Sequence, residues 1–179
     1  MQDKNWLAQQ LDLLLTGHGY NLYNDANRAR ADDLLVRQHA CGLLGEAANH
    51  LGRLATDYTA NRLPPSTRDH PFPTAAEIAP LKQLQALRAE VSTLASRIRG
   101  LSVPTQDRVW ARFRTETTTL EFLLSSDYHL ITAADKALNT VLPASAATWT
   151  EEIGFDLQNG LREVEQLTRD REQFLKSST

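Results

Sequence analysis

One apolar pattern near the middle of the chain restricts the fold more than any other feature. Six apolar residues follow one another at alternating spacings of three and four: Leu84, Leu87, Val91, Leu94, Ile98 and Leu101. This spacing places their side chains on one face of an α-helix, and it is typical of a helix that packs along other helices. The same seam is suited to pairing with a second copy, so a homodimer is one expected arrangement.

Similar patterns elsewhere predict that the rest of the chain is also helical. We expect three further long helices and two short ones, over about 25–62, 105–124, 150–176, 3–16 and 133–142. In the last of these, Thr132 is expected to cap the helix start. Because no run of alternating β-branched residues predicts a strand, the expected fold is all-α. It is an antiparallel bundle of about four long helices with one or two additional short helices, and residues 1–179 form a single domain.

A proline-rich segment interrupts the helical patterns after the first long helix. Residues 63–73 contain four prolines and cannot form a helix. They are followed by Thr74 and Glu77, whose spacing predicts a capping box at the start of the next helix. Pro80 then predicts either a kink or a helix that properly begins at that proline. The segment 63–73 is either a docking site or only a long connection, and both interpretations stay open.

The composition excludes several classes of protein. Cys41 is the only cysteine, so an intramolecular disulfide and a cysteine-based zinc site are both excluded. The sequence has no apolar stretch of the roughly 20 residues needed to cross a membrane, and its first residues lack the pattern of a signal peptide. We therefore expect a cytoplasmic protein without membrane contact.

The residues with reactive or metal-binding side chains form only weak patterns. Cys41 falls on an apolar helical stripe, which predicts a buried and unreactive thiol. His39, Glu46 and His50 are weak metal-ligand candidates, because their spacings of seven and four can place them on one helical face. Neither His39 nor His50 is followed, at the characteristic positions, by the lysine and glycine that histidine phosphotransfer domains have. We expect no catalytic residues, no metal and no cofactor.

Arginine is concentrated in one part of the chain. Between Lys82 and Arg114 there are seven basic residues and two acidic ones, although the whole chain has a net charge of −3. Five of these residues are the candidate nucleic-acid-binding patch: Arg97, Arg99, Arg108, Arg112 and Arg114. The alternative interpretation is a solvated helix surface with no ligand. The last helix, by contrast, is acidic.

One local segment resembles a known family. Residues 33–51, with Gly45-Glu46-Ala47 in their second half, are similar to a helix of the HEPN superfamily, whose members are helical bundles of prokaryotic toxin–antitoxin and defence systems. The family's ribonuclease motif is an arginine followed four to six residues later by a histidine. That motif is absent around His70 and His129. The resemblance therefore implies a bundle with a partner-binding role and without nuclease activity.

Two functions from different classes follow from these observations. The first is a non-enzymatic interaction or accessory subunit of a prokaryotic multi-protein complex. Its partner there is another protein or a second copy of the chain. The second is a small helical subunit of a ribonucleoprotein or antiviral defence complex, in which the arginine patch contacts RNA or DNA phosphates. In neither case do we expect an enzyme.

Overall fold

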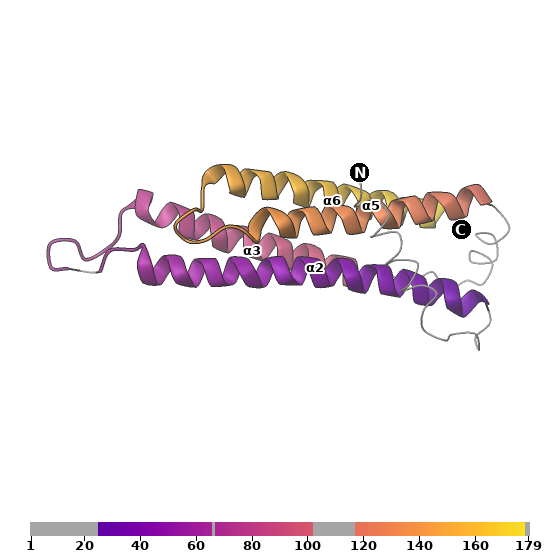
Figure 1. Cartoon of the computed structure of the whole chain (residues 1–179), viewed down its shortest axis with the longest axis horizontal. Coiled ribbons are helices and arrows are strands. Elements are labelled where there is room, and N and C mark those ends of the chain that lie inside the picture. The colour runs from indigo at the N-terminus through magenta and orange to yellow at the C-terminus, as the bar shows by residue number, and fades with distance from the viewer. Residues whose placement is uncertain (1–24, 66, 102–116, 178–179) are drawn as a thin grey trace.

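The structure is a computed structural model that describes residues 25–65, 67–101 and 117–177. In these ranges the chain forms four long helices and no strand. The helices are α2 (Asp25–Asn61), α3 (Ala75–Gly100), α5 (Thr117–Val141) and α6 (Glu151–Ser177). They lie along one common axis (Figure 1). The predicted all-α fold with four main helices is therefore confirmed, whereas the predicted helix over 3–16 lies outside the described residues.

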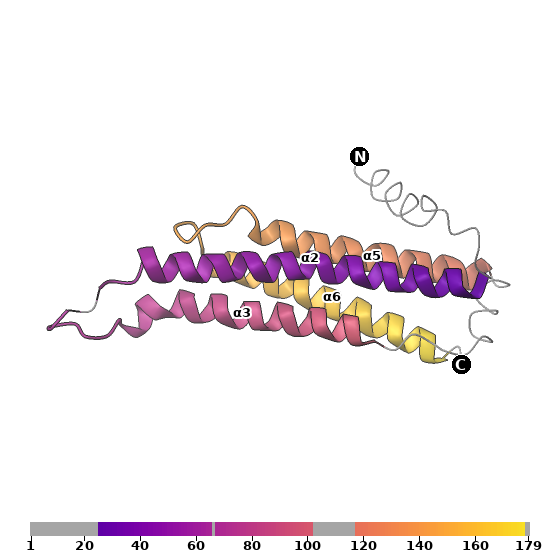
Figure 2. The same cartoon turned by 90° about the horizontal axis from the view of Figure 1, so that it is seen from below.

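Consecutive helices run in opposite directions, as predicted, but neighbours from different hairpins are parallel. Helix α2 packs against α3 and α5, and α6 packs against α5 and α3. Gln83 meets Trp149 near the starts of α3 and α6, and Arg97 meets Glu165 further along both helices. These two helices thus point the same way, and Figures 1 and 2 show the same for α2 and α5. The bundle is a pair of antiparallel hairpins, α2–α3 and α5–α6, packed side by side.

The apolar seam of α3 lies in the centre of the bundle. Leu84, Val91 and Ile98 have no exposed surface, and they share one core with residues of all the other helices. The seam is therefore used inside its own chain. The apolar stripe that contains Cys41 is expected from the sequence to begin at Leu34, seven residues earlier, and this expectation is wrong because 47% of the Leu34 surface is exposed.

The start of α3 has the predicted capping box. The Thr74 hydroxyl accepts a hydrogen bond from the Glu77 amide at 3.3 Å, and the Glu77 carboxylate accepts one from the Thr74 amide at 2.7 Å. This second bond holds the pKa of Glu77 below its ordinary value. Pro80 lies inside α3, which is assigned as one helix from Ala75 to Gly100, so the helix does not begin at the proline.

Helix α5 differs from the prediction of a fresh helix after Thr132. It is continuous from Thr117 to Val141, and Thr132 lies in its interior. The Thr132 hydroxyl donates to the Tyr128 carbonyl one turn earlier, at 2.8 Å. A threonine that bonds back in this way is accommodated within a helix, so it does not mark a helix start. Residues 102–116, which include the predicted helix start near 105, lie outside the described ranges.

The helices bury their apolar sides and turn most of their charged side chains outward. In α6, Leu157, Leu161 and Val164 are buried, while Glu151 and Glu152 are exposed. Among the described residues, no helix combines the length and the apolar character that spanning a membrane requires.

Candidate interaction surface

The α2–α3 hairpin reaches further than the α5–α6 hairpin at one end of the molecule. The His50 ring lies beside the Ala144 carbonyl, just after the end of α5, while α2 continues to Asn61. Figures 1 and 2 show the loop between α2 and α3 projecting beyond the turn that joins α5 to α6. We refer to residues 58–80, the last turn of α2, the loop and the first turns of α3, as the arm.

Specific contacts hold both ends of the loop, where it leaves α2 and where it enters α3. The Tyr58 hydroxyl donates to the Glu77 carbonyl at 3.1 Å and so joins the end of α2 to the start of α3. The backbone amide of Leu63 donates to the Tyr58 carbonyl, and the side chains of Leu63 and Ile78 pack against the core. With the capping box at Thr74, these contacts fix where the loop leaves and re-enters the bundle.

The loop itself contains a hydrogen-bonded turn followed by an exposed aromatic residue. The Thr67 amide donates to the His70 carbonyl, and the His70 amide donates to the Thr67 hydroxyl, both at 3.1 Å. Pro71 and Pro73 flank Phe72, whose surface is 83% exposed. Pro71 has a fixed φ, and Pro73 restricts Phe72, the residue before it, to extended conformations. The loop thus presents an apolar side chain to water on a restrained backbone.

The arm has almost no interior of its own. None of the described residues between Tyr58 and Pro80 is fully buried. Exposed apolar side chains are present on both the loop and α3: Pro64, Pro65, Pro71, Phe72, Ala76 and Ala79. Single exposed apolar residues are normal on protein surfaces, and it is large contiguous apolar patches that mark interaction sites.

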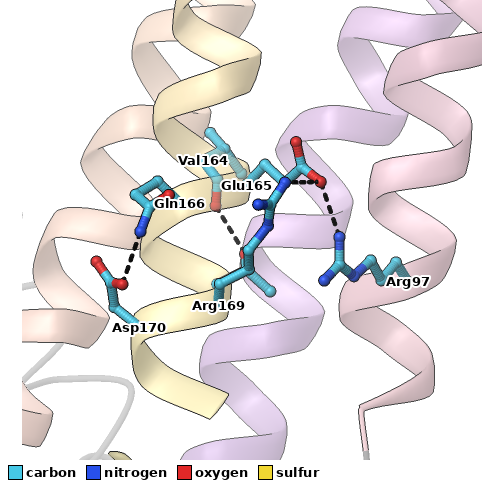
Figure 3. A network of polar contacts seen from close by, with 7 residues as sticks. Arg97, Val164, Glu165, Gln166, Arg169 and Asp170 are labelled. Atoms are coloured by element: carbon cyan, nitrogen blue, oxygen red, sulfur yellow. Dashed lines mark hydrogen bonds and ion pairs between the residues drawn. The ribbon is translucent and has the colours of Figure 1, made fainter. Parts of the chain in front are cut away.

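The structure does not bring the described members of the arginine patch together. Arg97 forms an ion pair with Glu165 of α6 at 2.9 Å, and Arg169 contacts the same carboxylate oxygen at 2.6 Å (Figure 3). Arg99, two residues after Arg97 and so on another side of α3, lies near Cys41 of α2. One predicted phosphate-binding residue therefore already has an acidic partner. The other three, Arg108, Arg112 and Arg114, lie outside the described residues.

The ion pairs around Glu165 predict a dependence of stability on pH. The hydrogen bond from Arg169 holds the pKa of Glu165 below its ordinary value of 4.5, and the bond from Arg97 acts in the same direction. A lowered pKa means that this stabilisation is complete well above pH 4.5 and is lost as the pH falls through the lowered value. We expect Glu165→Gln to lower the free energy of unfolding at pH 7 by less than about 1 kcal/mol, because the partners are exposed.

Urea unfolding of both proteins at pH 7 and at about pH 3 measures this difference. At the lower pH the difference should shrink, because Glu165 is then increasingly protonated in the original chain. Glu90→Gln makes the same chemical change at an exposed position in the middle of α3 and is the matched control. A difference that is equal at both pH values would contradict the role of the ionised carboxylate.

The weak metal candidates are not assembled into a site. His39 and Glu46 are exposed, whereas His50 is partly buried and both of its ring nitrogens have protein partners. Its Nε2 lies 3.1 Å from the Ala144 carbonyl, and its Nδ1 lies 3.2 Å from Arg53. A neutral ring that donates from Nε2 and accepts at Nδ1 satisfies both contacts. In the part of the chain that the structure describes, no three histidine, cysteine, aspartate or glutamate side chains form a metal-binding group.

Cys41 is a core residue, as predicted. It is 3% exposed, and its thiol donates to the Ala95 carbonyl at 3.1 Å. Burial raises the pKa of the Cys41 thiol, while the nearby Arg99 and Arg37 guanidinium groups oppose this shift. A buried thiol with a raised pKa is a poor nucleophile, so Cys41 has a structural role.

A buried ion pair was missed by the sequence analysis. Arg171 of α6 contacts the Asp127 carboxylate of α5 at 2.6 Å, and the two side chains are only 5% and 13% exposed. Thr168, one turn earlier in α6, is fully buried and donates to the Val164 carbonyl. The sequence does contain a signal for the burial of these two residues. Thr168 and Arg171 continue the spacing of three and four residues that relates Leu157, Leu161 and Val164.

Comparisons with protein-family models, with curated proteins and with solved structures found no match to this chain.

Proposed function

We propose that this protein is a non-enzymatic interaction subunit of a prokaryotic multi-protein complex, located in the cytoplasm. The observation that supports the proposal is the exposure of Phe72, 83% of whose surface is open to solvent. Phe72 belongs to the arm, whose loop projects from one end of the bundle (Figure 1) and is held at both of its ends by specific contacts. Such a restrained loop loses little conformational entropy on binding, which favours affinity. Phenylalanine is also among the aromatic residues that are enriched in protein interfaces.

The remaining candidate residues support this assignment. His50 and Cys41 contact carbonyl groups of neighbouring segments, where they tie the bundle together. Arg97 is paired with Glu165, which reduces its capacity to bind a phosphate. The resemblance of residues 33–51 to the HEPN superfamily, without the ribonuclease motif, agrees with a bundle that binds a partner.

A photo-crosslinking amino acid at position 72, introduced in host cells, tests the proposal. We expect irradiation to produce a discrete adduct, larger than the monomer, that contains this chain and one protein. Phe155 is the matched control, because it is also an exposed phenylalanine but lies on α6, outside the arm. The proposal fails if position 72 yields no adduct, or only the same diffuse products as position 155.

Contact of the arginine patch with RNA or DNA stays the alternative function. It is separated from the first by size-exclusion chromatography of the purified protein with short RNA and DNA. An interaction subunit elutes free of nucleic acid at low and at moderate salt. A nucleic-acid-bearing peak that weakens as salt rises would favour the arginine patch instead.

A further inference from the structure

The four sides of the helical bundle are not closed equally. The loop after α2 and the turn after α5 join the helices of each hairpin, whereas the α2–α5 side and the α3–α6 side hold one hairpin against the other. Among the neighbouring helices that the structure describes, α3 and α6 make the least extensive contact. Native proteins open locally where the density of contacts is low, so the α3–α6 side is the place to look for such an opening.

Polar side chains bridge α3 and α6. Arg97 reaches across to Glu165 (Figure 3), but both side chains are substantially exposed, and exposed ion pairs contribute little to stability. The indole nitrogen of Trp149, just before α6, donates to the Gln83 side-chain oxygen of α3 at 3.0 Å. Because Trp149 is only 9% exposed, this hydrogen bond is partly shielded from water, and we expect it to be the more important of the two bridges.

A glycine in the first turn of α6 makes room for the Gln83 amide. A methyl group on Gly154 would lie 2.7 Å from the Gln83 Cδ, which is far inside normal contact distance. At Gly160, two turns later, the same methyl group would lie 3.8 Å from the Ala137 Cβ of α5, which is an ordinary contact. The Gln83 amide is thus held between Trp149 and the backbone of Gly154. We refer to these three residues as the latch.

The other contacts keep each hairpin together and join α2 to α5. The Cys41 thiol of α2 donates to the Ala95 carbonyl of α3, and the buried Asp127–Arg171 pair joins α5 to α6. On the side of the bundle opposite to the latch, the His50 ring of α2 contacts a carbonyl just after α5. Separation of α3 from α6 leaves all three of these contacts in place.

We propose that the bundle opens along its α3–α6 side while both hairpins stay intact, and that the latch of Gln83, Trp149 and Gly154 controls this opening. The α2–α5 contact serves as the hinge. The motion uncovers the buried apolar sides of α3 and α6 at a smaller cost than global unfolding, because the core within each hairpin is kept.

Labelling of two buried thiols with iodoacetamide measures the opening. Val164→Cys places one thiol at a position of α6 with no exposed surface, beside Glu165, and the native Cys41 reports separation of α2 from α3. Peptide mass spectrometry follows each rate, which is divided by the rate of the same thiol in the urea-unfolded protein. We expect the Val164→Cys thiol to react at least about tenfold faster than Cys41, because local opening is more frequent than global unfolding.

Substitutions in the latch test its control of the opening. Gly154→Ala displaces the Gln83 amide and breaks its bond to Trp149, so it should accelerate the Val164→Cys thiol about two- to tenfold and leave Cys41 unchanged. Gly160→Ala makes the same chemical change without displacing a side chain and is the matched control. Gln83→Ala should accelerate the same thiol, and adding Gly154→Ala to it should have no further effect, because the new methyl group then meets no amide.

Several results would overturn the inference. Equal relative rates for the two thiols would show that the core is uncovered only by global unfolding. Equal acceleration by Gly154→Ala and Gly160→Ala, or an equal effect of Gly154→Ala on both thiols, would remove the latch from its controlling role. Thr168→Cys, at a second fully buried position of α6, repeats the measurement if Val164→Cys alters the helical circular dichroism spectrum.

Discussion

Asp127→Asn is expected to lower the free energy of unfolding by about 3–5 kcal/mol, because it removes the charge of one partner of a buried ion pair. The contact with Arg171 joins α5 to α6 at 2.6 Å, and its two side chains are almost completely shielded from water. In such surroundings the attraction between opposite charges is much stronger than at the surface, and burying a charge is costly. Urea unfolding at pH 7, followed by circular dichroism, measures the change.

The control for this substitution is Asp156→Asn on the exposed side of α6. It makes the same chemical change without a buried partner and should alter the stability by no more than about 0.5 kcal/mol. If both variants lost the same small amount of stability, Asp127 would contribute no more than a surface carboxylate. A large loss of stability in Asp127→Asn alone would identify the ion pair as a main contact that holds α5 and α6 together.

Leu84→Ala is expected to lower the free energy of unfolding by about 2–5 kcal/mol. Leu84 has no exposed surface and belongs to the α3 seam at the centre of the core. Truncation removes buried apolar surface and leaves a cavity that the surrounding helices fill only in part. Leu34→Ala, at a leucine with 47% of its surface exposed, removes the same atoms and should have a much smaller effect. Equal losses in the two variants would show that the α3 seam does not lie at the centre of the core.

Features that depend on neighbours within about one heptad could be predicted from the sequence. The α3 seam, the Thr74–Glu77 capping box and the proline-rich loop were all predicted at the places where the structure has them. Each depends on a local cause: helical periodicity, a side chain that reaches a nearby amide, or a ring that fixes φ. Thr132 is an exception, because the same residue that caps a helix can also bond back to an earlier carbonyl within one.

The candidate sites depended on distant neighbours, and this limited their prediction. Arg97 and Arg99 were placed in one patch because they are close in sequence, but Arg97 meets α6 and Arg99 approaches α2. His50 was considered as a metal ligand, although the folded chain places its ring beside Ala144, far along the sequence. The side on which each residue finds its partner depends on which helices are neighbours.

Taken alone, the amino-acid sequence determined the helical class of this protein, the helix start at Thr74 and the place of the long loop, because short-range periodicity and backbone restrictions produce all three. The order of the helices around the bundle came only from the tertiary structure, since the same apolar faces are compatible with more than one arrangement. The burial of Arg171 with Asp127 follows from that order. Whether a polar or apolar side chain is covered depends on the helix that lies opposite it, and that is decided by packing between segments distant in sequence.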